Sequence, residues 1–224
     1  MTLVRTLQGE NLVGDLERAY VALAGALLRH RAGGCAALEG VNPVWIDEVV
    51  CATEQRVDLR ATRAVCPLIG ADHERPGEIF NNLGHMFVLL QAMSILREKC
   101  SLEAVKCAPT QQSKHDGERM ADLQGQTWAL EAYGGIDIAN NDKLALDLRT
   151  LSLRRAPVSR AFLACREIAF SAVSKLPDGA ARQVNDICAL RRGGPFSAEA
   201  SVRVIGRLNG VVVLEVESVS ITER

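Results

Sequence analysis

The dipeptide Asn209-Gly210 stands between two apolar runs near the end of this 224-residue chain. The runs cover residues 200–205 and 211–221, and each is long enough to form a β-strand. Both residues of the dipeptide tolerate a positive φ, which a two-residue hairpin turn requires. The pattern therefore predicts a β-hairpin, which either extends a larger sheet or makes a contact in a homodimer.

The composition is that of an ordinary globular protein, with 48% apolar and 24% charged residues. The length allows one large domain or a domain with a helical extension, and we favour the second arrangement. The seven cysteines are scattered, and the absence of a Cys-x-x-Cys pair argues against a disulfide framework or a zinc site. Because the chain begins without the apolar segment of a secretory signal, we expect a cytoplasmic protein that makes no contact with a membrane.

Charge is distributed unevenly along the chain, although the net charge is only −1. The segment from Lys143 to Arg192 has ten basic and four acidic residues, a balance of +6, and the remainder has a balance of −7. A basic segment of this kind is typical of a surface that faces phosphate groups. An ordinary solvated helix face would give the same pattern.

Apolar periodicity predicts a helical N-terminal region, with a first helix over about residues 11–31 that is closed by Gly33-Gly34. Residues 35–70 show no sustained period, and we expect one or two strands with loops there. The next elements are predicted in the order helix 79–99, strands 103–108, 120–124 and 127–133, helix 141–154 and strand 160–168. The last of these is also compatible with a helix because its alternation is imperfect. The fold class is therefore mixed α/β.

Two carboxylates, Asp122 and Glu131, lie on the predicted strands on either side of a tight turn at Gln124-Gly125. If the turn folds back, the two side chains are close enough to hold one hard divalent cation. The strand around Glu131 is largely apolar and is predicted to be buried, where a carboxylate needs a partner or a metal. The alternative is a surface hairpin with two exposed acids.

The element order over residues 78–170, with an Asp on the second strand and a Glu on the third, resembles the PD-(D/E)xK nuclease superfamily, which includes many restriction endonucleases. The resemblance implies a restriction-endonuclease-like core, preceded by a helical region (1–77) and followed by an extension with the hairpin (171–224). It also implies that Asp122 and Glu131 bind Mg²⁺ or Mn²⁺ and that Glu78, at the start of the long helix, is a further ligand. In phosphodiester cleavage such a cation neutralises developing charge and lowers the pKa of bound water.

The family pattern also includes a lysine two positions after the Glu, where this chain has Tyr133, and a proline where it has Ala121. Some members carry the equivalent lysine on the following helix, and Lys143 lies just inside that predicted helix. Either Lys143 completes the catalytic set or the site is degenerate.

The function implied by the resemblance is metal-dependent endonucleolytic cleavage of DNA, in a restriction or defence setting. Arg154, Arg155 and Arg160 would then contact phosphates of the nucleic acid, although arginines near helix ends are also common on surfaces. The alternative is a non-catalytic binding or assembly module on a nuclease-like or unrelated scaffold, which Tyr133 favours. His85 is expected as a hydrogen-bonded residue at the boundary of the core.

Overall fold

The computed structural model describes residues 7–8, 11–38, 56–66, 69–100, 106–107, 121–134, 141–153, 158–175, 184–190 and 196–223. Within these ranges the fold is mixed α/β, with a nine-stranded sheet between helices. In spatial order the strands are β1 (Leu7–Gln8), β4 (Lys106–Cys107), β5 (Leu123–Gln124), β6 (Trp128–Tyr133), β7 (Arg160–Arg166), β11 (Val211–Glu223), β10 (Phe196–Leu208), β9 (Val184–Leu190) and β8 (Ser174–Lys175). The helices are α1 (Leu12–Leu38), α3 (Arg60–Val65), α4 (Pro76–Leu96), α5 (Asn141–Ser152) and α6 (Glu167–Val173), and β2 (Val57–Asp58) pairs with β3 (His73–Glu74).

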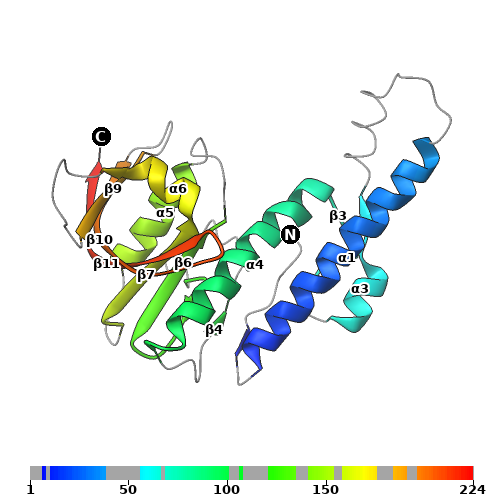
Figure 1. Ribbon diagram of the computed structural model, residues 1–224, viewed down its shortest axis with the longest axis horizontal. Helices are drawn as coiled ribbons and strands as arrows, with labels where there is room; N and C mark the ends of the chain where they lie inside the picture. The colour runs from blue at the N-terminus through cyan, green and yellow to red at the C-terminus, as the bar shows by residue number, and fades with distance from the viewer. Residues whose placement is uncertain are drawn as a thin grey trace.

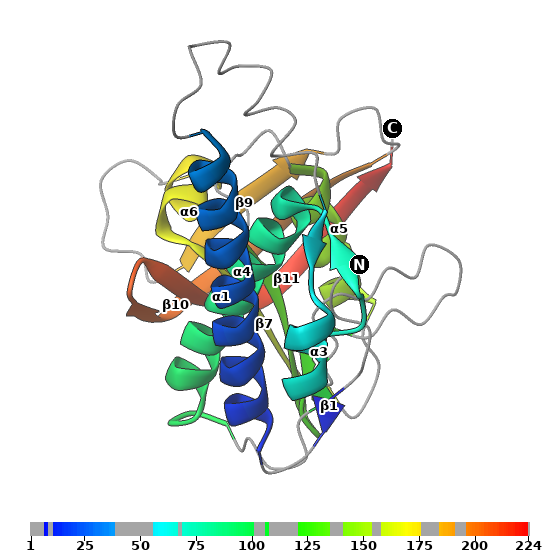
Figure 2. The ribbon, with the colours of Figure 1, turned by 90° about the vertical axis from the view of Figure 1, so that its right-hand side faces the viewer.

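The helices cover both faces of the sheet, because successive residues of each strand point to opposite sides. On β7, Phe162 belongs to the core that α4 and α1 share with the sheet, and Leu163 belongs to the core that α5 shares with it. Figure 1 shows α4 between the sheet and α1, with α5 on the far side of the sheet. Figure 2 views the molecule from the α1 side, where α1 lies in front of α4. The sheet thus has a buried apolar layer on each face.

Helix α4 confirms the predicted long helix and begins at Pro76, three residues earlier than predicted. Proline is favoured at a first helical position because its missing N–H has no partner to lose there. In the described part of the chain, α4 is the one helix long and apolar enough to cross a membrane. Its buried residues pack against α1 and the sheet, as those of a core helix in a soluble protein do.

The predicted order of helix, three strands, helix and strand is confirmed by α4, β4, β5, β6, α5 and β7. Strands β4, β5 and β6 are successively antiparallel, and β7 runs parallel to β6 after the crossover through α5. The strand interpretation of residues 160–168 is confirmed for Arg160–Arg166, after which the chain turns helical in α6.

The predicted C-terminal hairpin is confirmed, and it extends the sheet. Asn209 and Gly210 have φ values of 49° and 73°, the positive values that the turn requires. Strands β10 and β11 are longer than predicted, and β11 pairs with β7. The hairpin therefore continues the same sheet that contains β5 and β6.

Two expectations in the N-terminal region are corrected. Helix α1 does not end at Gly33-Gly34 but continues through both glycines to Leu38. A glycine inside a helix costs only about 1 kcal/mol, and the following residues Ala36 and Ala37 favour the helix. Between residues 35 and 70, the short strand β2 agrees with the prediction, whereas α3 is a helix that lacks a periodic signal. The remainder of that segment, residues 39–55 and 67–68, lies outside the described residues.

Candidate functional site

The pairing of β5 with β6 brings Asp122 opposite Glu131. Leu123 pairs with Leu130 and Gln124 with Ala129. Continuing this register by one residue places Asp122 opposite Glu131. The turn itself lies slightly later than predicted, because the Gly125 N–H donates to the Trp128 carbonyl at 2.9 Å. Asp122 is 6% exposed and Glu131 is fully buried. The alternative of two exposed surface acids is therefore wrong.

Directly before the first residue of β5, the carboxylate of Asp122 takes the place of a backbone acceptor for β6. Its Oδ2 accepts a hydrogen bond from the Ala132 N–H at 2.8 Å, where a longer β5 would have offered a carbonyl oxygen. The same oxygen lies 3.4 Å from His85 Nε2. Both of these contacts use the same carboxylate oxygen, Oδ2.

Helix α5 brings a lysine to the same residue, Ala132. Lys143 Nζ donates to the Ala132 carbonyl at 2.8 Å and to Asp147 Oδ2 at 3.0 Å. Asp147 is fully buried, and the Lys143 side chain is 35% exposed. The first turn of α5 is thereby joined to β6 at Ala132, the residue that follows Glu131 and whose N–H binds Asp122.

The pKa values of Lys143 and Asp122 depend on the charges of their neighbours. Burial favours the neutral amine of Lys143, but attraction to Asp147, and then to Asp122 and Glu131, raises the pKa of that amine. Burial likewise favours the protonated form of Asp122, but His85, Lys143 and the Ala132 N–H together lower the pKa of that carboxyl group. At neutral pH the site therefore contains a carboxylate at Asp122 and an ammonium group at Lys143.

His85 reaches Asp122 because α4 approaches the end of β6 very closely. A Cβ atom on Gly134 would lie 2.6 Å from the His85 nitrogen and 2.7 Å from its Cα, which is closer than backbone atoms allow. Gly134 follows β6 directly, so this position needs glycine for the two backbones to meet. His85 is 8% exposed, so the predicted core or boundary position is confirmed. The predicted hydrogen bond is not seen at Nε2, which among the described residues has no hydrogen-bond partner.

The other predicted site residues lie apart from this cluster or outside the described residues. Glu78 is exposed in the first turn of α4. It precedes His85 by seven positions, which is about 10 Å along a helix axis. Arg154 and Arg155 belong to residues 154–157, which are not among those described.

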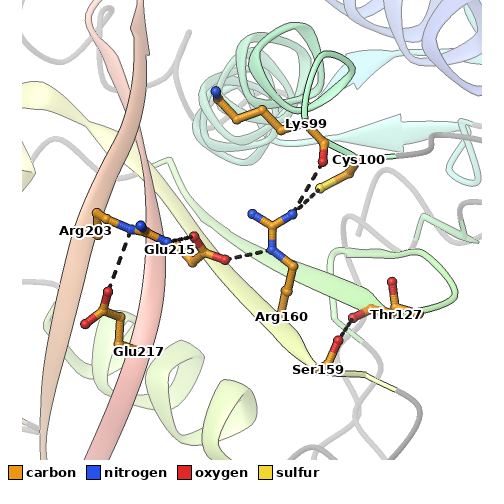
Figure 3. A network of polar contacts seen from close by, with 8 residues as sticks. All are labelled: Lys99, Cys100, Thr127, Ser159, Arg160, Arg203, Glu215 and Glu217. Atoms are coloured by element: carbon orange, nitrogen blue, oxygen red, sulfur yellow. Dashed lines mark hydrogen bonds and ion pairs between the residues drawn. The ribbon is translucent and has the colours of Figure 1, made fainter.

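Arg160 begins β7, three residues before Leu163, which is the β7 partner of Glu131. It pairs with Trp128 at the start of β6, whereas Glu131 pairs with Leu163. Its Nε donates to Glu215 Oε1 at 2.7 Å, and its Nη1 lies 3.4 Å from the Lys99 carbonyl oxygen (Figure 3). Glu215 also accepts from Arg203 Nη2 at 2.6 Å. These contacts give Arg160 a structural role in joining β7 to β11 and to the end of α4.

The donor set at the end of β6 fits a hard divalent cation in its chemistry. Asp122 and Glu131 offer carboxylate oxygens, and Mg²⁺ is commonly held by one or two carboxylates together with water and substrate phosphates. Over the described ranges, no group of three or more His, Cys, Asp or Glu side chains is arranged to hold a metal ion by itself. A cation here would therefore depend on water or substrate for part of its coordination.

Asp147 and His85 complete the cluster, and the sequence alone did not indicate either role. For Asp147 one signal was present, since it lies four residues after Lys143 and between Leu144 and Leu148, on the apolar face of the helix. For His85 the contact with Asp122 depends on how closely α4 approaches β6, and no short sequence pattern predicts that approach.

Comparison of the chain with family models, with curated proteins and with solved structures gave no match.

Proposed function

We propose that the protein is a Mg²⁺-dependent endonuclease that cleaves DNA, with its active site at the carboxyl end of β6. The observation that carries the proposal is that Asp122 and Lys143 both bind the backbone of Ala132, the residue directly after the buried Glu131. The element order from α4 to β7 supports a restriction-endonuclease-like core for residues 78–170. A cytoplasmic location agrees with the free thiols of Cys66, Cys100 and Cys165.

In this proposal Asp122 and Glu131 hold the metal ion. When bound, Mg²⁺ would neutralise charge on the scissile phosphate and lower the pKa of a bound water. The Oδ2 atom of Asp122 accepts a hydrogen bond from the Ala132 N–H. That hydrogen bond also fixes the orientation of the carboxylate before substrate arrives, which favours transition-state stabilisation.

Lys143 acts in this proposal as a cation and a hydrogen-bond donor. Its raised pKa keeps the amine protonated at neutral pH, so it cannot accept a proton from the attacking water. An ammonium group has three donors, and the described contacts use two of them. The third can orient water or a phosphate oxygen.

Phosphate contacts are proposed for Arg154 and Arg155, which follow α5 in the basic part of the chain. Arg160 is the weakest of the three predicted phosphate contacts, because its guanidinium is held by Glu215. Glu78 stays a candidate additional ligand only if substrate brings it closer to the acids.

Cleavage of supercoiled plasmid in the presence of Mg²⁺ or Mn²⁺ tests the proposal. D122N and E131Q keep the shape of each side chain but remove a charge, and we expect each to lose at least about a hundredfold in rate. D58N is the matched control, since Asp58 is exposed on β2 and pairs with Arg60. Equal nicking by wild type, D122N and E131Q would show that another protein or another site cleaves the DNA.

A non-catalytic binding or assembly module is the second candidate, and the contacts of Ala132 favour it. Asp122 and Lys143 satisfy the N–H and the carbonyl of that residue, which is a structural role needing no substrate. Tyr133, 1% exposed, occupies the position of the family's lysine. Calorimetric titration with Mg²⁺ and Mn²⁺ separates the candidates, because the enzyme requires binding that D122N weakens and the module requires none.

A further inference from the structure

Asp147 is a buried carboxyl group that the proposed reaction does not yet use. It is fully buried in α5, and Leu144 and Leu148 of the same helix belong to the apolar core beneath the sheet. Placing a carboxylate in such surroundings is costly unless it is paired. One of its partners is the Lys143 ammonium group, whose Nζ lies 3.0 Å from Asp147 Oδ2.

Stabilisation of the helix is a poor explanation for this pair. In an isolated helix, an acid that precedes a lysine by four residues stabilises more than the reverse order, and here the lysine comes first. Lys143 is the third residue of α5, where the positive end of the helix dipole disfavours a cation. The pair is therefore oriented against the preference of the helix that contains it.

The pair does explain how the ammonium group reaches β6. Lys143 Nζ is held from one side by Asp147 on its own helix and from the other by the Ala132 carbonyl. Two partners on different elements restrict a side chain that would otherwise have four rotatable bonds. The Lys143 amine thus has a defined position beside Asp122 and Glu131.

We propose that Asp147 is a positioning residue, which holds the Lys143 ammonium group at the carboxyl end of β6 so that a lysine from α5 serves where Tyr133 occupies the usual lysine position. This inference rests on the proposed endonuclease function. Asp147 is not itself in contact with substrate or metal in this scheme. It acts through Lys143, in the way that supporting residues around an active site hold the catalytic side chains in position.

The first experiment is independent of cleavage. In a ¹⁵N–¹H NMR spectrum of the whole protein, an ammonium group held by two partners gives a slowly exchanging Nζ signal, which K143R identifies by its loss. We expect this signal in wild type and in the D58N control, and its disappearance in D147N. A Lys143 signal that persists unchanged in D147N would overturn the proposal, whatever the protein cleaves.

The second experiment measures plasmid cleavage with the same variants. We expect D147N to lower kcat about 10- to 100-fold with little change in KM, and D147E to recover part of the loss because it restores the charge. Equal kcat values for D147N and wild type would overturn the positioning role. Wild-type protein without cleavage activity would instead refute the proposed function, while the NMR result still decides whether Asp147 holds Lys143.

Thermal unfolding of each variant separates loss of positioning from loss of fold. Should D147N unfold at the assay temperature, K143M with D147L replaces both charges by apolar groups of similar size, a change that is often neutral or stabilising for a buried pair. A folded double variant with wild-type kcat would contradict the proposal, because it would show that neither side chain is needed.

Discussion

Asp122 and Lys143 bind the two backbone groups of a single residue, Ala132. The carboxylate accepts the N–H at 2.8 Å and the ammonium group donates to the carbonyl at 2.8 Å. Asp122 lies directly before β5 and Lys143 in the first turn of α5, 21 positions later in the chain. The end of β6 is thus completed by two side chains of opposite charge.

The stability of the protein should depend on the ionisation of Asp122. Its pKa is lowered in the folded state, so it contributes stability that is fully present above the unfolded value of about 4 and is lost as the pH falls below that value. We expect D122N to lack this dependence. Urea unfolding at several pH values between about 3 and 7 should show a free-energy difference between wild type and D122N that shrinks at the acid end. A constant difference down to about pH 3 would contradict the prediction.

Gly134 should not tolerate a side chain. In G134A the new Cβ would collide with the backbone of His85, which can move only if α4 moves. We expect a loss of about 1–3 kcal/mol in the free energy of unfolding, as in other overpacked sites.

G77A, in the first turn of α4, is the matched control for G134A. No atom of the described residues lies within 4 Å of the Cβ that alanine would add at this position. Because alanine favours helix over glycine, G77A should stabilise the protein by about 0.5–1 kcal/mol. Similar behaviour of both variants in urea unfolding would show that the close approach at Gly134 is unimportant.

Arg160 should contribute to stability through Glu215. Because its side chain is 38% exposed and screened by solvent, R160Q should cost only about 0.5–1 kcal/mol. A double-mutant cycle with E215Q, measured by urea unfolding, should assign most of that loss to the pair. If the two substitutions are additive, the ion pair in Figure 3 does not contribute measurably.

DNA binding should distinguish Arg160 from the arginines after α5. If Arg154 and Arg155 contact phosphates, replacing both with Gln should weaken DNA binding and reduce the slope of log K against log salt by up to about two. R160Q should leave that slope unchanged, because the guanidinium of Arg160 is bound to Glu215. Fluorescence anisotropy with a DNA duplex at several salt concentrations measures both. An altered slope in R160Q alone would reverse the assignment.

The sequence predicted the parts of this fold that depend on local patterns. Apolar periodicity is sufficient for α4, β6 and α5, because each buries the face that its own residues define. The hairpin turn at Asn209-Gly210 follows in the same way from the φ values that two residues accept. Glycine is a weaker signal inside a helix, which is why α1 continues past Gly33-Gly34.

The features of the candidate site also differ in whether local sequence patterns predict them. Element order and strand register, both predicted from local patterns, place Asp122 directly before β5, near Glu131 on β6, and Lys143 in the first turn of the next helix. The four-residue spacing of Lys143 and Asp147 is a local signal for their pair. The contacts of Lys143 with Ala132, of His85 with Asp122 and of Arg160 with Glu215 are visible only in the folded protein. These contacts join residues up to 55 positions apart, and their geometry depends on how closely the helices approach the sheet. Packing distances of this kind arise from the whole core at once and leave no trace in any short stretch of sequence.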